Sequence, residues 1–235
     1  YDLVILVNYF DISLFACSMS HSSPIQNHLC NVTLLGNLVA KPDIRYQANP
    51  VIAIAEMVVA THSKWYDKAN KQYREWTNYH TVKMIGDVVE RSLLHANKGD
   101  IVLIQGHLVD SKKNSRQIIH ATYAHPYPKG YAKSINQIYT SGQLASDVVL
   151  RTTENSRTFA EISLEMNFFV HSPVTGEMRN VTLSRLVHVW EAQASYLSEQ
   201  ASQGDQLIVD GKLNYLKNDK QQQMIDAHHV VLLRS

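Results

Sequence analysis

The sequence repeats itself at a spacing of a little under half its length, and this constrains the fold more than any other feature. Three pairs of segments recur in the same order, at offsets of 106, 109 and 105 residues. The pairs are 34–45 with 139–151, 56–63 with 165–172, and 98–108 with 203–213. The first pair places Gly142 on Gly36. Three matching pairs of segments in the same order indicate a duplicated domain.

Short β-branched and apolar runs separated by turn residues are typical of strands, and the first copy has five of them. The runs are 32–39, 51–63, 72–85, 101–109 and 117–125. A short helix, capped by Asp87, is expected between the third and fourth runs. This is the order of an OB barrel. We therefore predict an all-β chain of two tandem OB-fold barrels, each with five strands and one helix between the third and fourth strands.

The second copy differs from the first in two expected ways. Its hairpin between the second and third strands, with the turn PVTGEMRN, is expected to be several residues shorter and lacks Trp and Tyr. Its helix is expected to be longer and to carry Trp190 and Tyr196. Trp190 and the strand residues Phe168 and Phe169 are expected to be buried in a core or an interface.

Domain boundaries follow from the repeat and from PYPKGYAKS, whose two prolines and glycine indicate a linker. We predict an N-terminal extension at 1–30, OB domain 1 at 31–125, a linker at 126–135 and OB domain 2 at 136–235. The apolar run at 1–18 is too short and too interrupted to span a membrane, and it lacks the basic start of a signal peptide. We interpret Met19 as the initiator; a packed N-terminal strand is the alternative.

Aromatic and basic side chains are interleaved from residue 64 to residue 79 of the first copy. Single-stranded nucleic acid is bound by such a mixture, because cations follow its phosphates and flat rings stack on its bases. A hairpin whose aromatics cover a neighbouring core is the alternative interpretation. Net charge over the whole chain is only +1, but residues 31–125 carry 12 basic against 8 acidic side chains, and residues 136–235 carry 8 against 11. Positive potential is therefore expected on the first copy and the linker.

The first copy resembles the bacterial single-stranded DNA-binding protein (SSB) family over about residues 31–124. Four segments carry the resemblance in the family's order: the G-N-L turn of the first strand, the hairpin from Trp65, an aromatic–histidine pair before V-x-x-x-G (79–86), and K-G-x-x-V-x-x-x-G (98–106). The resemblance implies sequence-tolerant binding of single-stranded DNA in replication, recombination or repair, mainly through OB domain 1. It also implies a homodimer, which would supply four OB domains, and replication proteins as possible partners.

The resemblance implies a role in stacking on DNA for Trp65 and Tyr79, and a role in subunit contacts for His80. Ile85 stands where many members carry a stacking Phe, and the last hairpin has no Trp. With fewer aromatic side chains to stack on the bases, phosphate contacts should contribute a larger share of the affinity, and binding should be more sensitive to salt. The candidate DNA-binding residues are Trp65, Trp76, Tyr79, Arg45, Lys64, Lys68, Lys71, Arg74, Lys83, Lys112, Lys113 and Arg116.

No motif for catalysis, phosphate binding or metal binding is present in the sequence. Cys17 and Cys30 form no C-x-x-C pair. The adjacent His228 and His229 point to opposite faces of a strand, so one ion is not easily held by both. We predict no enzyme, no metal, no cofactor, and a cytoplasmic, nucleoid-associated location.

Two alternatives remain open at this point. In the first, the OB folds chiefly hold proteins in replication restart or conjugation and bind nucleic acid weakly. In the second, the ligand is RNA, since stacking and phosphate contacts serve both nucleic acids.

Overall fold

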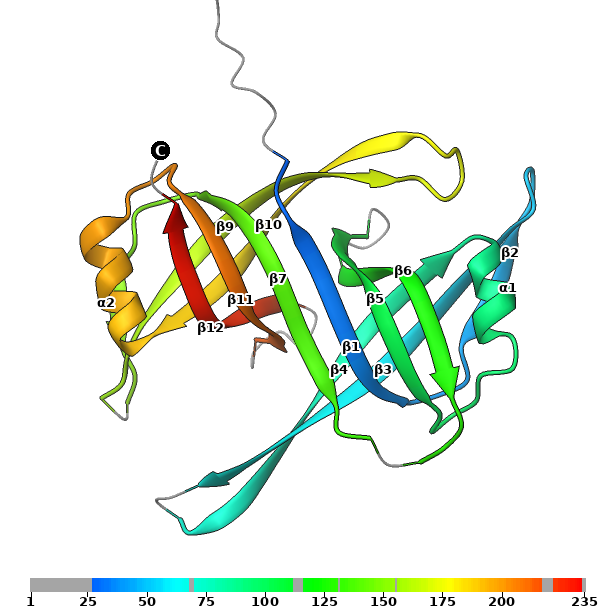
Figure 1. The fold of residues 1–235 in the computed structure, drawn as a ribbon, viewed down its shortest axis with the longest axis horizontal. Helices are drawn as coiled ribbons and strands as arrows, with labels where there is room; N and C mark the ends of the chain where they lie inside the picture. Colours follow the sequence, from blue (N-terminus) through cyan, green and yellow to red (C-terminus); the bar gives the residue numbers. More distant parts are fainter. Residues whose placement is uncertain are drawn as a thin grey trace, which may run out of the picture.

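A computed structural model describes residues 27–67, 70–111, 116–130, 132–154, 156–216 and 222–233. The interpretation of Met19 as the initiator lies outside these ranges. In Figure 1 the described strands form one continuous twelve-stranded sheet that curls into two barrels. The first copy contains β1 (Cys30–Leu38), β2 (Asp43–Gln47), β3 (Ile52–Asp67), β4 (Gln72–Ile85), α1 (Asp87–Leu93), β5 (Ile101–Asp110) and β6 (Gln117–Tyr127). The second contains β7 (Ile135–Leu144), β8 (Leu150–Thr152), β9 (Thr158–His171), β10 (Met178–Trp190), α2 (Glu191–Gln200), β11 (Gln206–Tyr215) and β12 (Gln223–Leu233).

Each barrel closes because its first strand pairs on both sides: β1 with β5 and β3, and β7 with β11 and β9. A glycine makes the closure possible. A Cβ on Gly36 would lie 2.3 Å from the carbonyl oxygen of Ala60, and a Cβ on Gly142 would lie 2.5 Å from that of Glu165. Only a residue without a side chain fits so close to another backbone. The predicted fold, two tandem barrels with a helix before the fourth barrel strand, is confirmed. Each copy has one strand more than the five predicted, because the short strands β2 and β8 pair at the two edges of the sheet.

Strand registers give the true equivalence between the copies. Leu38 pairs with Val59 in the first barrel, and Leu144 pairs with Leu164 in the second. The offset from β3 to β9 is therefore 105 residues, and the predicted match of 56–63 with 165–172 is wrong by four. The second strand of each hairpin, β4 in the first copy and β10 in the second, follows the same offset of 105 residues. The β3–β4 and β9–β10 ladders have matching registers at that offset. The two hairpins are thus equally long, and the predicted shortening of the second is wrong.

Two helix predictions also need correction, although α2 is indeed longer than α1. Trp190 is the last residue of β10 and precedes the helix, because the strand keeps its alternation up to that point. At an offset of 105, Trp190 occupies the position of Ile85 in β4. Asp87 does not cap α1: Gly86 takes the cap position, no side chain caps the helix, and the Asp87 carboxylate instead pairs with Arg91 one turn later.

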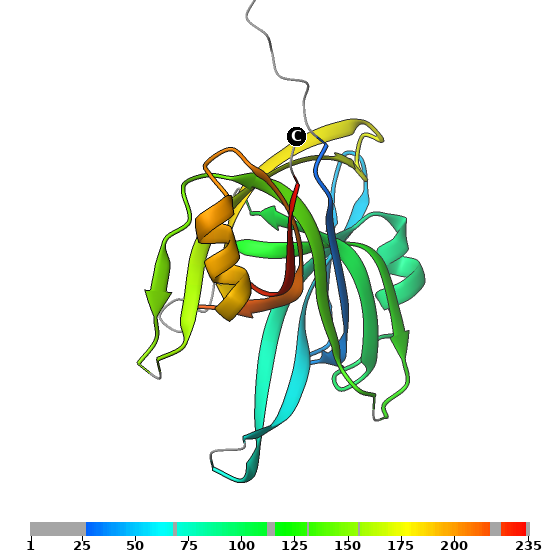
Figure 2. The same cartoon turned by 60° about the vertical axis from the view of Figure 1, so that its left-hand side comes forward.

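The two barrels are joined by antiparallel pairing of β1 with β7, which lie side by side in Figure 2. Val32 lies opposite Ile138 in this ladder, and both side chains are fully buried. Buried apolar side chains form one cluster that runs through both barrels. Cys30, at the start of β1, is a free thiol in this cluster, and burial raises its pKa to about 11. None of the helices in the described ranges is long and apolar enough to cross a membrane.

Two polar contacts at equivalent positions cross the junction. On one side, His80 Nδ1 lies 3.2 Å from the hydroxyl of Tyr215, and its other ring nitrogen lies 2.9 Å from Thr61 Oγ1. On the other side, the buried Arg185 donates to the Asp110 carboxylate at 2.7 Å. Burial lowers the pKa of His80 to about 4 and raises that of Tyr215 to about 12. His80 is therefore a neutral contact between the copies.

Because His80 stays neutral where an unfolded histidine would be protonated, acid should destabilise the fold. Its pKa falls from 6.5 to about 4 on folding, so its contribution is complete above pH 6.5 and is lost as the pH falls toward 4. Between pH 6.5 and about 5 the loss should be about 2 kcal/mol. Urea unfolding of His80→Gln should show a pH dependence weaker by that amount.

His95→Gln, which changes an exposed histidine beyond α1, is the matched control and should keep the full pH dependence. Equal pH dependence in the wild type and His80→Gln would mean that His80 is not held neutral at the junction. Burial also lowers the pKa of His107 to about 4. The contribution of His107 to the pH dependence should therefore remain in both variants.

Candidate nucleic-acid interface

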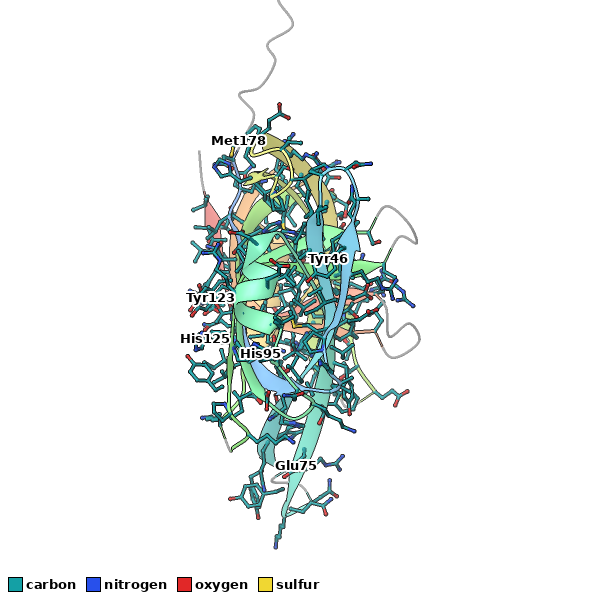
Figure 3. The ribbon with its side chains drawn as sticks, turned by 90° about the vertical axis from the view of Figure 1, so that its right-hand side faces the viewer. Tyr46, Glu75, His95, Tyr123, His125 and Met178 are labelled. Carbon is teal, nitrogen blue, oxygen red and sulfur yellow. The ribbon has the colours of Figure 1, made fainter. Side chains whose placement is uncertain are left out.

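The hairpin of β3 and β4 extends far beyond its barrel, with Glu75 near one end of the molecule in Figure 3 and Met178 of the equivalent hairpin near the other. Side chains alternate between the two faces of a strand pair. Trp65 pairs with Arg74 and Ser63 with Trp76, so these residues share one face. We call the side of Trp65, Arg74 and Trp76 the junction face, and the opposite side the outer face.

Two exposed indole rings lie on the junction face. Trp65 is 46% exposed and Trp76 is 52% exposed. The ring nitrogen of Trp76 donates to Asn78 Oδ1 at 2.9 Å, which fixes the orientation of the ring. Arg74 Nε lies 2.6 Å from the Asp67 carboxylate. The Arg74 side chain is half exposed, so a phosphate can approach the arginine from solvent.

The outer face combines tyrosines with Lys64. Lys64 lies 3.1 Å from Glu75 and 5.2 Å from the centre of the Tyr73 ring, and Tyr66 packs edge-on against Tyr73. Tyr79, 57% exposed, lies on this face nearer the barrel. The resemblance implied stacking for both Tyr79 and Trp65, but the hairpin separates them onto opposite faces. Trp76, not Tyr79, shares the surface of Trp65.

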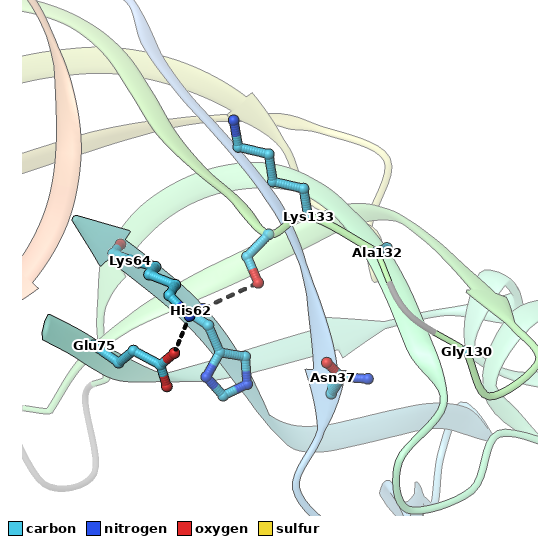
Figure 4. Close-up of a pocket in the computed structure, with 9 residues that line it drawn as sticks. Asn37, His62, Lys64, Glu75, Gly130, Ala132 and Lys133 are labelled. Atoms are coloured by element: carbon cyan, nitrogen blue, oxygen red, sulfur yellow. Dashed lines mark hydrogen bonds and ion pairs between the residues drawn. The ribbon is translucent and has the colours of Figure 1, made fainter. Parts of the chain in front are cut away.

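A cleft of about 720 Å³ separates the outer face from the segment that connects the barrels. In Figure 4, His62, Lys64 and Glu75 line one side, and Lys133 projects from the other. The backbone N–H of His62 donates to Ser134 Oγ at 3.0 Å and holds the connecting segment in place. Two lysines and one carboxylate thus leave the cleft positively charged, in agreement with the charge distribution along the sequence.

The remaining candidates are dispersed over the first barrel. Lys83 lies on β4 opposite Glu56, and Arg45 pairs with Asp43 on the exposed edge strand β2. Lys71 sits at the hairpin turn with a positive φ of 49°, and Arg116 is exposed where β6 begins. His80 is fully buried and offers no surface to a ligand. Lys68, Lys112 and Lys113 lie outside the described residues.

Sequence reasoning missed Trp190 as a surface residue. It is only partly buried, and its ring lies beside Phe159 at a centroid distance of 5.4 Å. The signal was present in the sequence: the match of residues 98–108 with residues 203–213 has an offset of 105, and the same offset places Trp190 on Ile85. The mistaken match of residues 56–63 with residues 165–172, at an offset of 109, obscured this equivalence.

Comparisons with known proteins agree on one family. A family model described as "Single-strand binding protein family" matches residues 29–124 and again residues 135–233. The single-stranded DNA-binding protein of Thermus aquaticus is 26% identical over 204 residues, which cover 79% of this chain and 75% of that protein. A crystal structure of a deletion variant of the Thermus aquaticus protein, 26% identical, matches 89% of this chain and 96% of its own with a TM-score of 0.73. The wild-type crystal structure, 24% identical, matches 89% and 95% with a TM-score of 0.72.

Removal of the Trp65 ring should weaken binding without disturbing the fold. The side chain is about half exposed and leaves no cavity in the core, and loss of one stacked base costs roughly 1–3 kcal/mol. Trp65→Ala should therefore bind a short oligo-dT more weakly by that amount and keep its melting temperature. The control is Tyr196→Ala on α2, which removes a ring of equal exposure, 46%, and should bind normally. Normal binding by Trp65→Ala, or its unfolding, would contradict the stacking role.

Proposed function

The chain belongs to the single-strand binding protein family, and from this premise we propose that it binds single-stranded DNA without sequence preference, mainly through the first barrel and its hairpin. The observation that carries the proposal is the hairpin itself: two exposed tryptophans on one face and a lysine-lined cleft on the other. Stacked rings accept any base, and lysines accept any phosphate, so neither contact selects a sequence.

The proposed function is binding rather than catalysis. Within the described ranges, no group of three or more His, Cys, Asp and Glu side chains is placed to hold a metal ion. Phosphate contacts and stacking would cover single strands exposed in replication, recombination or repair. Replication proteins acting on the same strands are the partners that this role implies.

The cleft beneath the outer face should govern salt dependence. For single strands, each neutralised phosphate contributes about −0.7 to the slope of log affinity against log salt concentration. The double variant Lys64→Gln and Lys133→Gln should therefore flatten the slope by roughly 1.4. Trp65→Ala should lower affinity with an unchanged slope, because stacking releases no counterions. Titration of oligo-dT and the matched RNA at several salt concentrations measures both effects.

These titrations separate four outcomes. Binding of DNA with the expected slopes supports the proposal, and tighter binding of RNA would redefine the ligand. A wild-type chain that binds neither oligomer would favour the alternative of a protein-interaction module. An unchanged slope in the double variant would mean that the strand does not pass through the cleft.

We further propose that the chain forms a homodimer and thereby assembles four OB domains. The support is the sheet face, defined as the outward side of β6, β5, β1, β7, β11 and β12. Its exposed apolar side chains are Tyr123, Tyr127, Ile135, Tyr139, Ile208, Val231 and Leu233. Tyr123 and His125 project from this side of the molecule in Figure 3.

Charge is almost absent from the sheet face. Strand registers align Tyr123 with Gln105, Gln105 with Thr33, and Thr33 with Gln137, so uncharged side chains run across the strands. Among the described outward positions, the charged residues are Asp210 and, beyond the β-bulge of β11, Lys212 and Asp226, which pair with each other. A broad, uncharged and partly apolar face suits self-association about a twofold axis, where one face meets its own copy.

A charge at the centre of the sheet face should dissociate the dimer. Tyr139, 44% exposed on β7, is the site, and Tyr139→Arg would bring two like charges together across the axis. Light scattering should give twice 26.7 kDa for the wild type and 26.7 kDa for the variant. Tyr196→Arg on α2 is the control and should remain dimeric. A monomeric wild type, or a dimeric Tyr139→Arg, would contradict this assembly.

A further inference from the structure

A row of three basic side chains crosses the first barrel beneath the hairpin of the second copy. Lys83 of β4 lies opposite His120 of β6, and His120 lies opposite His107 of β5. The centres of the two imidazole rings are 5.1 Å apart. All three side chains line a groove of about 580 Å³, which Val170 and Val181 of the second hairpin also line. We call Lys83, His120 and His107 the basic row.

The second barrel has the equivalent groove, of about 570 Å³, beneath the first hairpin. That groove is lined by all three tryptophans of the chain, Trp65, Trp76 and Trp190. The strand registers place His188, Asp226 and Lys212 at the positions of the basic row. Asp226, the equivalent of His120, accepts from the Trp190 ring nitrogen at 2.7 Å and lies 3.3 Å from Lys212 Nζ. The middle of this row is therefore a carboxylate that the chain itself supplies and surrounds with donors.

The groove of the basic row has a surplus of positive charge. Among the described residues that line it, Asp110 is the one carboxylate, and Asp110 binds the buried Arg185 at 2.7 Å. Lys83 and, on the second hairpin, Arg179 are cations that line the groove. The remaining titratable side chains are His107, His120 and His171 in the groove and Glu56, opposite Lys83 on β3. An anion is therefore the ligand that this groove suits.

Both histidines of the basic row are uncharged at neutral pH. Burial, with a smaller contribution from His120, lowers the pKa of His107 to about 4. Burial, followed by the charge of Lys83, lowers the pKa of His120. Nδ1 of His120 is buried and has no hydrogen-bond partner among the described residues. Because a neighbouring anion stabilises the protonated form of histidine, an oxyanion beside the row would draw a proton onto it.

We propose that the basic row binds a phosphate of the single strand and takes up a proton as it does so, which makes binding by the first barrel tighter in mild acid. This rests on the proposed function and deepens it by naming how one contact is regulated. The proton comes from solvent and stays on an imidazole nitrogen. The phosphate supplies from outside the negative charge that Asp226 supplies in the second barrel. Ser111, in the basic turn 110–116, also lines the groove, so a strand drawn to that turn lies next to the row.

The pH dependence of affinity tests the row. Each proton taken up with the ligand contributes one decade of affinity per pH unit, so one proton should tighten binding of a short oligo-dT by about tenfold from pH 6.5 to pH 5.5. The double variant His107→Gln and His120→Gln should bind like the wild type at pH 7.5 and lose this gain. His95→Gln, which changes an exposed histidine beyond α1, is the matched control and should keep it.

A second double variant guards against a loss of fold. His107→Lys with His120→Asp installs the pair that the second barrel carries on the equivalent backbone, so the variant should fold and should also lose the gain. Calorimetric titration at pH 6 in two buffers of different ionisation enthalpy counts the protons. Both double variants should take up about one proton fewer than the wild type on binding oligo-dT.

Proton NMR of the imidazole rings locates the proton. Oligo-dT should raise the pKa of His107 or His120 and leave that of His95 unchanged, which a merely structural role of the row would not do. An equal effect of inorganic phosphate would identify a free-anion site and overturn the role in strand binding. Equal proton uptake in the wild type and both double variants would overturn the row but not the proposed function, because binding at pH 7.5 measures that function separately. A wild-type chain that binds oligo-dT at neither pH would overturn the proposed function itself.

Discussion

The pairing of β1 with β7 is the constraint on which the rest of the molecule depends. Each strand has two edges, and both edges of these strands are used, within the barrel and across the junction. Because the ladder is antiparallel, it relates the two copies by a pseudo-twofold axis. That axis sends each long hairpin over the other copy's barrel. The contacts of His80 and Arg185 across the junction, and the sheet face that runs over both barrels, follow from this one ladder.

Equivalent positions at the junction are stabilised in different ways. His80 is neutral and shares its two ring nitrogens between Thr61 and Tyr215. Arg185 occupies the equivalent position at an offset of 105, keeps its charge in the interior, and depends on Asp110 for compensation. Loss of one partner from a buried ion pair leaves an uncompensated charge and costs far more than loss of a neutral hydrogen bond. The two sides of the junction therefore differ in their sensitivity to substitution, although their backbones match.

The fold and the family were predictable from the sequence because they depend on signals that are local or regularly spaced. β-branched and apolar runs separated by turn residues identified the strands, and the repeat identified two barrels; fold and family are both confirmed. The register of the hairpins was not predictable from letters alone. In a strand with a two-residue period, a shift by four residues preserves the pattern, and this is why 56–63 was matched to the wrong segment.

The exposed aromatic residues of the hairpin could be named from the sequence, but their arrangement could not be predicted. Trp65 and Tyr79 lie fourteen positions apart across a turn, and only the register of β3 against β4 shows that they occupy opposite faces. Trp190 lies more than one hundred positions from Trp65. Its proximity depends on the junction ladder, which no local pattern encodes. The individual DNA contacts assigned to these residues stay predictions.

The pseudo-twofold axis relates the backbones of the two grooves but not their side chains. In a pair of identical single-barrel chains, the axis would make the two grooves equal, and a strand crossing both would meet the same side chains from either end. Here the axis carries Trp190 onto Ile85 and Trp65 onto Val170. A strand laid across the molecule meets indole rings first in one direction and last in the other. Joining two copies in one chain thus allows equivalent positions on the two sides of the junction to carry different side chains, which a pair of identical chains cannot do.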